Sequence, residues 1–375
     1  MANSINHQRF PIHQNPSGST EVLHIIDIDS GNAGPNIYLQ ASVHGAEVQG
    51  NLTLFKLYEL LKETPFNGRV RLVPLANPRG INQKQGTFTQ GRFNPVTGHN
   101  WNRNYTDISK HIDTDEFAKN NQNESADKIQ KKFKELLSKQ LEKSELSQKL
   151  YGPQENKLLN ITLQKLAASA DVVLDLHTGP VACRYLYVPE YLKKRSQDLG
   201  FPYAVIIPHE FAGAMDEASF MPWVKLAQSL KTLGVSFENP FEAYTVELGS
   251  EEKICEKRAE DELSRITHYL AQRGVLPLSE YPKVSEQQNW GALKDFKTYF
   301  APSAGLVEYQ VGVGEKFKAG DQLGRILTWP NDTQKPWHTI TAQADGALIN
   351  HSPSAVISQG MELFQVLENL EPFSS

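Results

Sequence analysis

The stretch YLQASVHGAEVQGN, residues 38–51, combines three elements of an α/β fold with two potential metal ligands. Its first half is apolar and predicts a buried strand, Gly45 lies in a turn, and the residues after Val48 begin a helix. His44 and Glu47 lie three residues apart at the start of this helix. Side chains spaced in this way project to one side, so an imidazole and a carboxylate can meet one ion. We therefore predict that this stretch supplies two of the three protein ligands of a catalytic zinc.

Strands surround this stretch in a β-α-β order. Residues 21–28 and 36–43 are rich in apolar and β-branched side chains and predict two strands. Apolar residues recur at helical spacing over residues 48–62, and residues 69–76 predict a further strand. This order indicates an α/β layer structure, a mixed sheet flanked by helices, with catalytic groups at the ends of strands.

Two later strands carry side chains that complete a zinc-hydrolase site. Residues 171–177 (DVVLDLH) form a mainly apolar strand that ends on His177, and residues 243–249 (AYTVELG) contain Glu247. Alone, this histidine would be read as a core or loop residue and the glutamate as an exposed edge residue. Beside the first two ligands, they predict a third ligand and a general base. His209 also follows a strand, but its spacing is unsuitable for a ligand, and we expect it in a loop or pocket wall.

A long polar loop is predicted over residues 77–105, directly after a strand. Loops of this length without structure of their own are often functional. Its arginines and asparagines suit the recognition of carboxylates, because they offer forked donors and amides. We expect Arg92 to stabilise an oxyanion, and Asn102 and Arg103 to hold a substrate carboxylate.

Changes in composition predict two domains. Residues 1–276 form the zinc-hydrolase α/β domain, which contains a Lys- and Glu-rich insertion at about 107–154. We interpret this insertion as one or two solvated surface helices rather than as a lid. Residues 277–375 begin with a polar linker and continue as short β segments with Gly turns. Within them, residues 305–326 and 346–364 form an internal repeat that indicates a small all-β sandwich-barrel domain.

Charge and composition exclude several classes of partner. The net charge of −5 gives no global basic field for nucleic acid or for an anionic membrane surface. Cys183 and Cys255 are too few for a disulfide framework and wrongly spaced for a thiolate metal site. The sequence contains neither a signal-peptide pattern nor a run of membrane-spanning length. We expect a cytoplasmic protein whose partner is a small molecule.

Taken in order, the motifs resemble those of a known family. The pattern is similar to that of the succinylglutamate desuccinylase/aspartoacylase family of zinc carboxypeptidase-like enzymes, through HGAE (44–47), NPRG (77–80), NR (102–103), DLH (175–177) and TVELG (245–249). The resemblance implies one Zn²⁺ per chain and a C-terminal β domain over the mouth of the active site. The residue roles that it implies are zinc ligands for His44, Glu47 and His177, general base for Glu247, carbonyl polarisation for Arg92, and binding of the substrate carboxylate for Asn102 and Arg103.

The sequence also departs from this family. Where the family typically reads Asp-Leu-Asn-Arg, residues 100–103 read NWNR. We expect Trp101 and the insertion at 107–154 to reshape the pocket, so the resemblance does not identify the acyl group. The C-terminal domain also resembles a biotinyl/lipoyl-like sandwich. Lys335 lacks the flanking residues of a carrier lysine, so we expect this domain to shape the substrate entrance rather than to carry a covalent cofactor.

Three functions remain open at this point. The first is zinc-dependent hydrolysis of the amide bond of an N-acyl amino acid, or of a similar small carboxylate-bearing amide, with the zinc-bound water activated by Glu247. The second is a metallocarboxypeptidase or peptide-modifying hydrolase that uses the same ion and base. The third is a non-enzymatic binding protein stabilised by its metal. The set of three ligands argues against it, because a structural zinc more often has four. The oligomeric state is left open.

Overall fold

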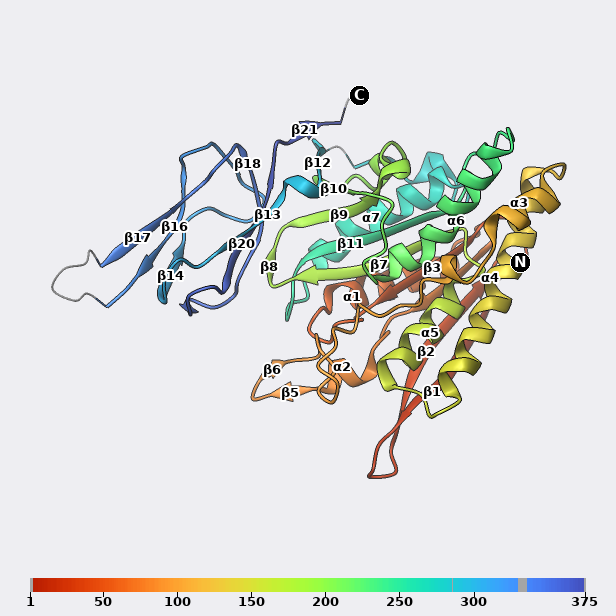
Figure 1. Cartoon of the computed structure of the whole chain (residues 1–375), viewed down its shortest axis with the longest axis horizontal. Coiled ribbons are helices and arrows are strands. Elements are labelled where there is room, and N and C mark those ends of the chain that lie inside the picture. Colours follow the sequence, from red (N-terminus) through yellow and green to blue (C-terminus); the bar gives the residue numbers. More distant parts are fainter. Residues whose placement is uncertain (1–2, 285, 330–335, 374–375) are drawn as a thin grey trace.

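The computed structural model describes residues 3–284, 286–329 and 336–373. Its centre is a ten-stranded mixed sheet with helices on both faces (Figure 1), which confirms the predicted mixed α/β sheet. In spatial order the strands are β1 (Ser4–Gln14), β2 (Thr20–Asp29), β4 (Arg69–Val73), β3 (Asn36–Ala41), β7 (Val172–Gly179), β11 (Glu242–Ser250), β9 (Arg184–Pro189), β10 (Tyr203–Ile207), β12 (Asn289–Ala292) and β21 (Glu371–Pro372). Over the described ranges, no helix has both the length and the apolar character needed to cross a membrane.

The central strands β3, β7 and β11 run parallel to one another and are buried on both faces. Leu174 of β7 packs in one layer with Leu57 and Tyr269, whereas its neighbour Val173 packs in the opposite layer with Phe220. Burial on both faces explains why these strands read as continuous apolar runs. The first layer contains α1 (Gln49–Glu63) and α7 (Glu256–Gln272), and the second contains α4 (Ala126–Lys149), α5 (Glu155–Ala167) and α6 (Met215–Thr232).

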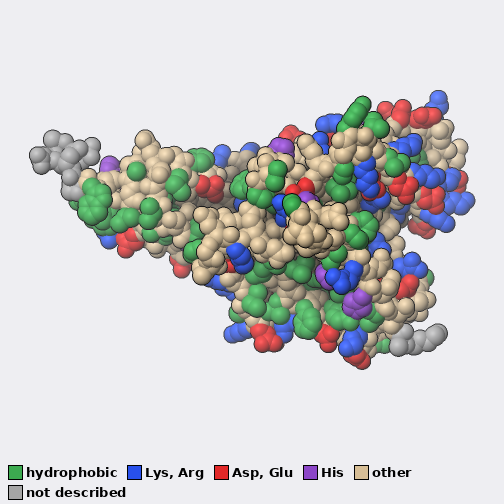
Figure 2. Space-filling view, turned by 90° about the horizontal axis from the view of Figure 1, so that it is seen from below, with side chains coloured by type: hydrophobic (Ala, Val, Ile, Leu, Met, Phe, Trp, Pro, Cys, Tyr) green, Lys and Arg blue, Asp and Glu red, His purple; other side chains and the backbone are tan. Residues whose placement is uncertain are grey.

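The charged segment at 107–154 folds into α3 (Thr114–Asn121) and α4, and one side of α4 belongs to the core. Phe133 is fully buried, and its ring centre lies 4.9 Å from that of Trp223 on α6. The apolar face ends before Leu146, whose side chain is 70% exposed. Charged side chains of both signs crowd the outer surface of this end of the molecule (Figure 2). A solvated outer surface over a packed inner face agrees with structural helices. A lid function is untested.

Two stretches contain more regular structure than we predicted. Residues 4–14 form β1, which pairs antiparallel with β2 at the edge of the sheet. The predicted loop at 77–105 contains α2 (Pro78–Asn82) and a hairpin of β5 (Lys84–Gln85) and β6 (Phe88–Thr89). The Asn77 side chain caps α2, because its Oδ1 accepts a hydrogen bond of 2.9 Å from the Gly80 backbone N–H. This asparagine therefore has a structural role.

The C-terminal part forms two small antiparallel sheets around a core of its own, which includes Leu323 and Phe364. The two predicted repeats have the same order of three strands, and the short middle strand of each pairs with the first strand of the other. Lys335 lies outside the described residues. The strands are β13 (Phe296–Phe300), β20 (Glu362–Glu368), β18 (Gly346–His351) and β15 (Lys316–Phe317) in one sheet, and β17 (Trp337–Thr341), β16 (Gln322–Leu327), β14 (Gly305–Tyr309) and β19 (Val356–Ile357) in the other.

The C-terminal part is joined to the main sheet at two places, the edge of the sheet and the end of β7. Its flanking strands β12 and β21 extend the main sheet at one edge. In addition, β8 (Val181–Ala182), which follows β7 directly, pairs with β18 through Ala182 and Asn350. The small β unit is thereby held beside the strand that carries His177 (Figure 1).

A buried carboxylate connects the two helices of the first layer. Glu262 of α7 is fully buried, and its Oε2 accepts hydrogen bonds from Gln49 Nε2 at 2.9 Å and from Thr53 Oγ1 at 2.7 Å. Burial raises the pKa of Glu262 from 4.5 to about 7. Because the folded state binds this proton more tightly than the unfolded state, the contribution of Glu262 to stability is lost as the pH rises through this interval.

Glu262→Gln is expected to remove this pH dependence, because a glutamine can accept both hydrogen bonds and does not ionise. Relative to wild type, the variant should gain on the order of 3 kcal/mol in unfolding free energy between about pH 5 and about pH 8. Urea unfolding at both pH values measures the change. Glu135→Gln, at an exposed position of α4, is the control. The same pH slope in wild type and Glu262→Gln would contradict the assignment.

Candidate active site

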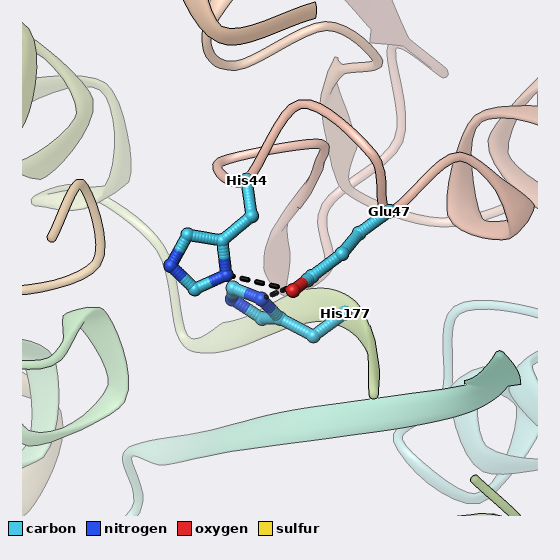
Figure 3. A group of neighbouring side chains, drawn as sticks. All are labelled: His44, Glu47 and His177. Carbon is cyan, nitrogen blue, oxygen red and sulfur yellow. Dashed lines mark hydrogen bonds and ion pairs between the residues drawn. The ribbon is translucent and has the colours of Figure 1, made fainter. Parts of the chain in front are cut away.

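Three predicted ligands converge where β3 and β7 end (Figure 3). His44 and Glu47 follow β3, His177 lies in β7, and all three side chains are buried. The Glu47 carboxylate lies between the two rings, with Oε1 2.8 Å from His44 Nδ1 and Oε2 2.7 Å from His177 Nδ1. One ligand atom from each residue lies within 4.8 Å of the others. This group can hold a metal ion, and two imidazoles with one carboxylate are a donor set typical of catalytic zinc.

Each imidazole is also held through its second ring nitrogen. His177 Nε2 lies 2.9 Å from Asp175 Oδ2, and Asp175 Oδ1 accepts a hydrogen bond of 2.8 Å from Gln40 Nε2. His44 Nε2 lies 2.8 Å from Asn100 Oδ1. The Asn100 oxygen accepts from His44 Nε2–H, which leaves Nδ1 of this ring to face an ion. The Asp175 carboxylate is an ion-pair partner of the His177 ring and orients it through charge.

Our sequence analysis assigned no role to Asp175 or to Asn100. For Asp175 a signal was present, because residues two apart in a strand point to the same face, and Asp175 precedes His177 by two. For Asn100 the sequence offers no such signal, since its contact with His44 depends on the path of a loop. Asn100 is the first residue of NWNR, the segment at which the sequence departs from the family pattern. Its amide contacts His44.

The turn that carries the first two ligands packs backbone against backbone. The Gly45 N–H donates to the Gly91 carbonyl at 3.0 Å, and a Cβ on Gly45 would lie 2.1 Å from the Gly80 carbonyl oxygen. Just before the turn, Ser42 has a φ of 59°, a conformation that costs a non-glycine residue about 1–2 kcal/mol. The Ser42 hydroxyl donates to the Glu47 carbonyl at 2.9 Å, which helps to hold this conformation.

Glu247 lies beside His177, because β11 and β7 pair in parallel with these two residues in register. Its side chain points to the site and is enclosed, with the residue only 9% exposed. Glu247 Oε2 has no hydrogen-bond partner within the described residues. Burial and the charge of Glu47 raise the pKa of Glu247 to about 8. A carboxylate with a free oxygen and a raised pKa is suited to receive a proton.

The other predicted residues line the same cavity, whose volume is about 630 Å³. Arg92 Nη1 lies 3.2 Å from Glu47 Oε1, and its side chain is half exposed. Asn102 Nδ2 lies 3.3 Å from His177 Nε2, and Arg103 Nη1 donates to the Asn102 carbonyl at 2.7 Å. The structure thus places all seven predicted site residues in one cavity.

Several neighbouring predictions were wrong. Arg79 and Asn94 belong to the arginines and asparagines of the loop for which carboxylate recognition was predicted, but both bind Glu155 and lie outside the cavity. Trp101 is fully buried and does not line the cavity, because it points into the protein core. The expectation for His209 is confirmed, because this residue lies in a loop after β10, exposed and beside Tyr191 at a ring distance of 5.6 Å. The predicted loop therefore lines the cavity through part of its length only.

Comparison with known proteins identifies the family of this chain. A family model described as the succinylglutamate desuccinylase/aspartoacylase catalytic domain matches residues 33–273. The chain belongs to this family. The resemblance inferred from the motifs is therefore confirmed, and the family is one of deacylating hydrolases.

Two solved structures of succinylglutamate desuccinylase/aspartoacylase family proteins are similar over nearly the whole chain. The protein from Shewanella frigidimarina NCIMB 400 is 36% identical, with 99% of each chain covered and a TM-score of 0.94. The protein from Shewanella amazonensis SB2B is 37% identical, with 98% of this chain and 100% of that chain covered and a TM-score of 0.93. A more distant relative, the N-alpha-acetyl-L-2,4-diaminobutyric acid deacetylase of Halomonas elongata, is 21% identical over 97% of this chain and 91% of its own length.

Asp175→Asn is expected to weaken zinc binding at the predicted site about 10- to 100-fold, because it removes the carboxylate charge that lies 2.9 Å from His177 Nε2 and orients this ring. Competition with a chromogenic chelator measures the dissociation constant. Asp127→Asn, an exposed substitution in the first turn of α4, is the matched control. Unchanged affinity in a folded Asp175→Asn protein would show that Asp175 does not position the ligand.

Proposed function

We propose that this protein is a zinc-dependent amidohydrolase that removes the acyl group from an N-acyl amino acid or a similar small carboxylate-bearing amide. The observation that carries the proposal is the buried group of His44, Glu47 and His177 beside Glu247, whose Oε2 is free within the described residues. Membership of a deacylase family supports acyl hydrolysis. The donor set of two imidazoles and one carboxylate supports zinc as the metal. The likeness of this protein to zinc carboxypeptidases is part of the same proposal.

The three ligands would hold zinc through Nδ1 of His44, Nδ1 of His177 and the carboxylate of Glu47. When bound, zinc supplies a Lewis acid that acidifies water and polarises the acyl oxygen. Glu247 takes the proton from the attacking water and passes it to the leaving nitrogen. Burial of Glu247 favours this role, because it makes the protonated form accessible near neutral pH.

Substrate contacts come from the remaining walls of the cavity. Arg92 is close enough to the ligand group to stabilise an oxyanion, and Asn102 with Arg103 offers donors for a carboxylate. Tyr185 and Tyr187 also line the cavity, and burial raises the pKa of both phenols well above the usual value. These phenols therefore stay protonated and can donate hydrogen bonds to the substrate.

The C-terminal unit favours small substrates over peptides. Asn350, Met361 and Gln365 form part of the cavity wall, so this unit contributes one side of the cavity. A long peptide would meet this wall, whereas a single acylated amino acid fits within about 630 Å³. The Halomonas relative is named for removing an acetyl group from an amino acid, which supports the same substrate class.

The zinc-loaded protein is expected to release free amino acid from N-acetyl and N-succinyl amino acids and to leave short unblocked peptides intact. Amine release, measured across both panels with chelator-treated protein as the control, tests this expectation. Hydrolysis of peptides alone would replace the proposal with a metallocarboxypeptidase. Absence of zinc-dependent turnover on both panels would favour a binding protein.

Glu247→Gln is expected to retain zinc and to lose at least about 100-fold in kcat, because it removes the proton acceptor and leaves the ligands in place. His177→Ala should lose both zinc and turnover, since it removes a ligand. Zinc content and kcat are measured on the same samples, with Glu135→Gln as the matched control. A Glu247→Gln protein with the wild-type kcat would exclude Glu247 as the base.

A further inference from the structure

Three buried side-chain amides form a stripe along one face of α5. Asn156, Asn160 and Gln164 are spaced four residues apart, so they lie one above the other on this helix. All three are buried, with exposed fractions of 0%, 1% and 5%. Burying an amide is unfavourable unless its polar atoms find partners. The partners of this amide stripe therefore indicate its role.

The partners all lie in one segment of the cavity loop, residues 99–106. The first amide nitrogen of the stripe lies 3.4 Å from His99 Nδ1, and the middle one donates a hydrogen bond of 2.5 Å to the Arg103 carbonyl. The last amide pairs with both backbone groups of Thr106, donating to its carbonyl at 2.8 Å and accepting from its N–H at 2.9 Å. The order of the contacts along the helix follows the order of the loop residues, so α5 supports this segment from end to end.

The supported segment carries the two residues proposed to bind the substrate carboxylate. Asn102 and Arg103 line the cavity, whereas Asn160 lies behind them and is not part of its wall. The Arg103 backbone is held by Asn160, and the Arg103 side chain donates to the Asn102 carbonyl at 2.7 Å. Directly afterwards the chain turns at Asn104, whose φ is 67°. A shift of the backbone at this turn would change the direction of the guanidinium group.

The amide stripe has a cost for the helix itself. Within the described residues, Asn156 Oδ1 and Asn160 Oδ1 have no hydrogen-bond partner, although both are buried. An apolar side chain at either position would leave no such oxygen unpaired. Two buried asparagines therefore stabilise α5 less than apolar residues would, and what they provide in return is the fixed position of the loop.

We propose that Asn160 is a positioning residue that directs Arg103 toward the substrate carboxylate, with Asn156 and Gln164 fixing the two ends of the same segment. This inference rests on the proposed function, in which Arg103 binds that carboxylate. Asn160 then sets the preference for carboxylate-bearing amides over neutral ones, although it contacts no substrate. A rigid support of this kind is what a binding group needs to keep its productive geometry.

The test compares substrates that differ in the carboxylate alone. N-acetylglycine, N-acetyl-L-methionine and N-acetyl-L-glutamate are each paired with their α-carboxamide and given to zinc-loaded protein. Asn160→Leu keeps the approximate volume and removes the donor. We expect kcat/KM to fall about 10- to 100-fold for the acids and less than about threefold for the carboxamides, because only the acids depend on the direction of Arg103.

Two further variants separate positioning from general damage to α5. Thr162→Val removes a buried hydroxyl of the same helix that donates to the Leu158 carbonyl and not to the loop, so it should leave both substrate series unchanged. Asn160→Gln retains an amide donor and should keep more of the preference for acids than Asn160→Leu. Thermal unfolding shows which variants are folded, and Asn160→Ala replaces Asn160→Leu if the latter is not.

The outcomes distinguish this inference from the proposed function. Equal losses for acids and carboxamides in a folded Asn160 variant, or no loss, would overturn the positioning role and leave the deacylase intact. Wild-type protein without a preference for acids would remove the carboxylate role of Arg103, and this inference with it. If none of the compounds is hydrolysed, the deacylase proposal fails, and calorimetry with N-acetylglycine and its carboxamide decides. Binding that Asn160→Leu weakens for the acid alone supports positioning, and any other result overturns it.

Discussion

The contact between Gly45 and Gly80 fixes the geometry on which the rest of the site depends. The distance of 2.1 Å that a Cβ on Gly45 would have from the Gly80 carbonyl oxygen is far below a van der Waals contact, so only glycine fits. The same carbonyl lies 2.2 Å from the Cβ that a side chain on Gly91 would need. Three chain segments, which carry the first two ligands, the α2 cap and the Arg92 to Arg103 loop, therefore meet through backbone atoms. Ligand and substrate contacts come from separate segments, and this packing holds them in one arrangement.

The second constraint is electrostatic. Parallel pairing of β3, β7 and β11 brings carboxylates and imidazoles to one edge of the sheet, where little water reaches them. Burial lowers the pKa of His177, but the carboxylates of Asp175 and Glu47 outweigh it and raise this pKa well above the usual value. A metal ion competes with this proton for the same acidic surroundings, so proton release and metal binding are coupled. The acidic cluster thus favours a cation, and the contacts at Nε2 of each imidazole orient the rings toward the place where the ion could be held.

The sequence predicted the features that depend on residues close together in the chain. It did not predict those that depend on contacts between distant segments. Strands with continuous apolar runs, and ligands at their ends, were predictable because periodicity and neighbour spacing are local. The exposed strand β1 was missed, since an edge strand with both faces in solvent has no apolar alternation. Trp101 and Asn100 are adjacent in a polar loop, yet one enters the core and the other holds His44. The path of the backbone alone determines which of these two side chains enters the core and which contacts His44.

The charge arrangement in the cavity also bears on the orientation of the substrate. In the proposed deacylase, Arg103 and Asn102 offer donors for a substrate carboxylate, and the ligand group with Glu247 defines where the amide reacts. Two groups of one α-carbon would then be bound at two different places, so the orientation of the substrate at the ligand group would depend on its carboxylate. Asn102 and Arg103 would therefore position the amide against the base, and their effect should extend beyond binding to the turnover step.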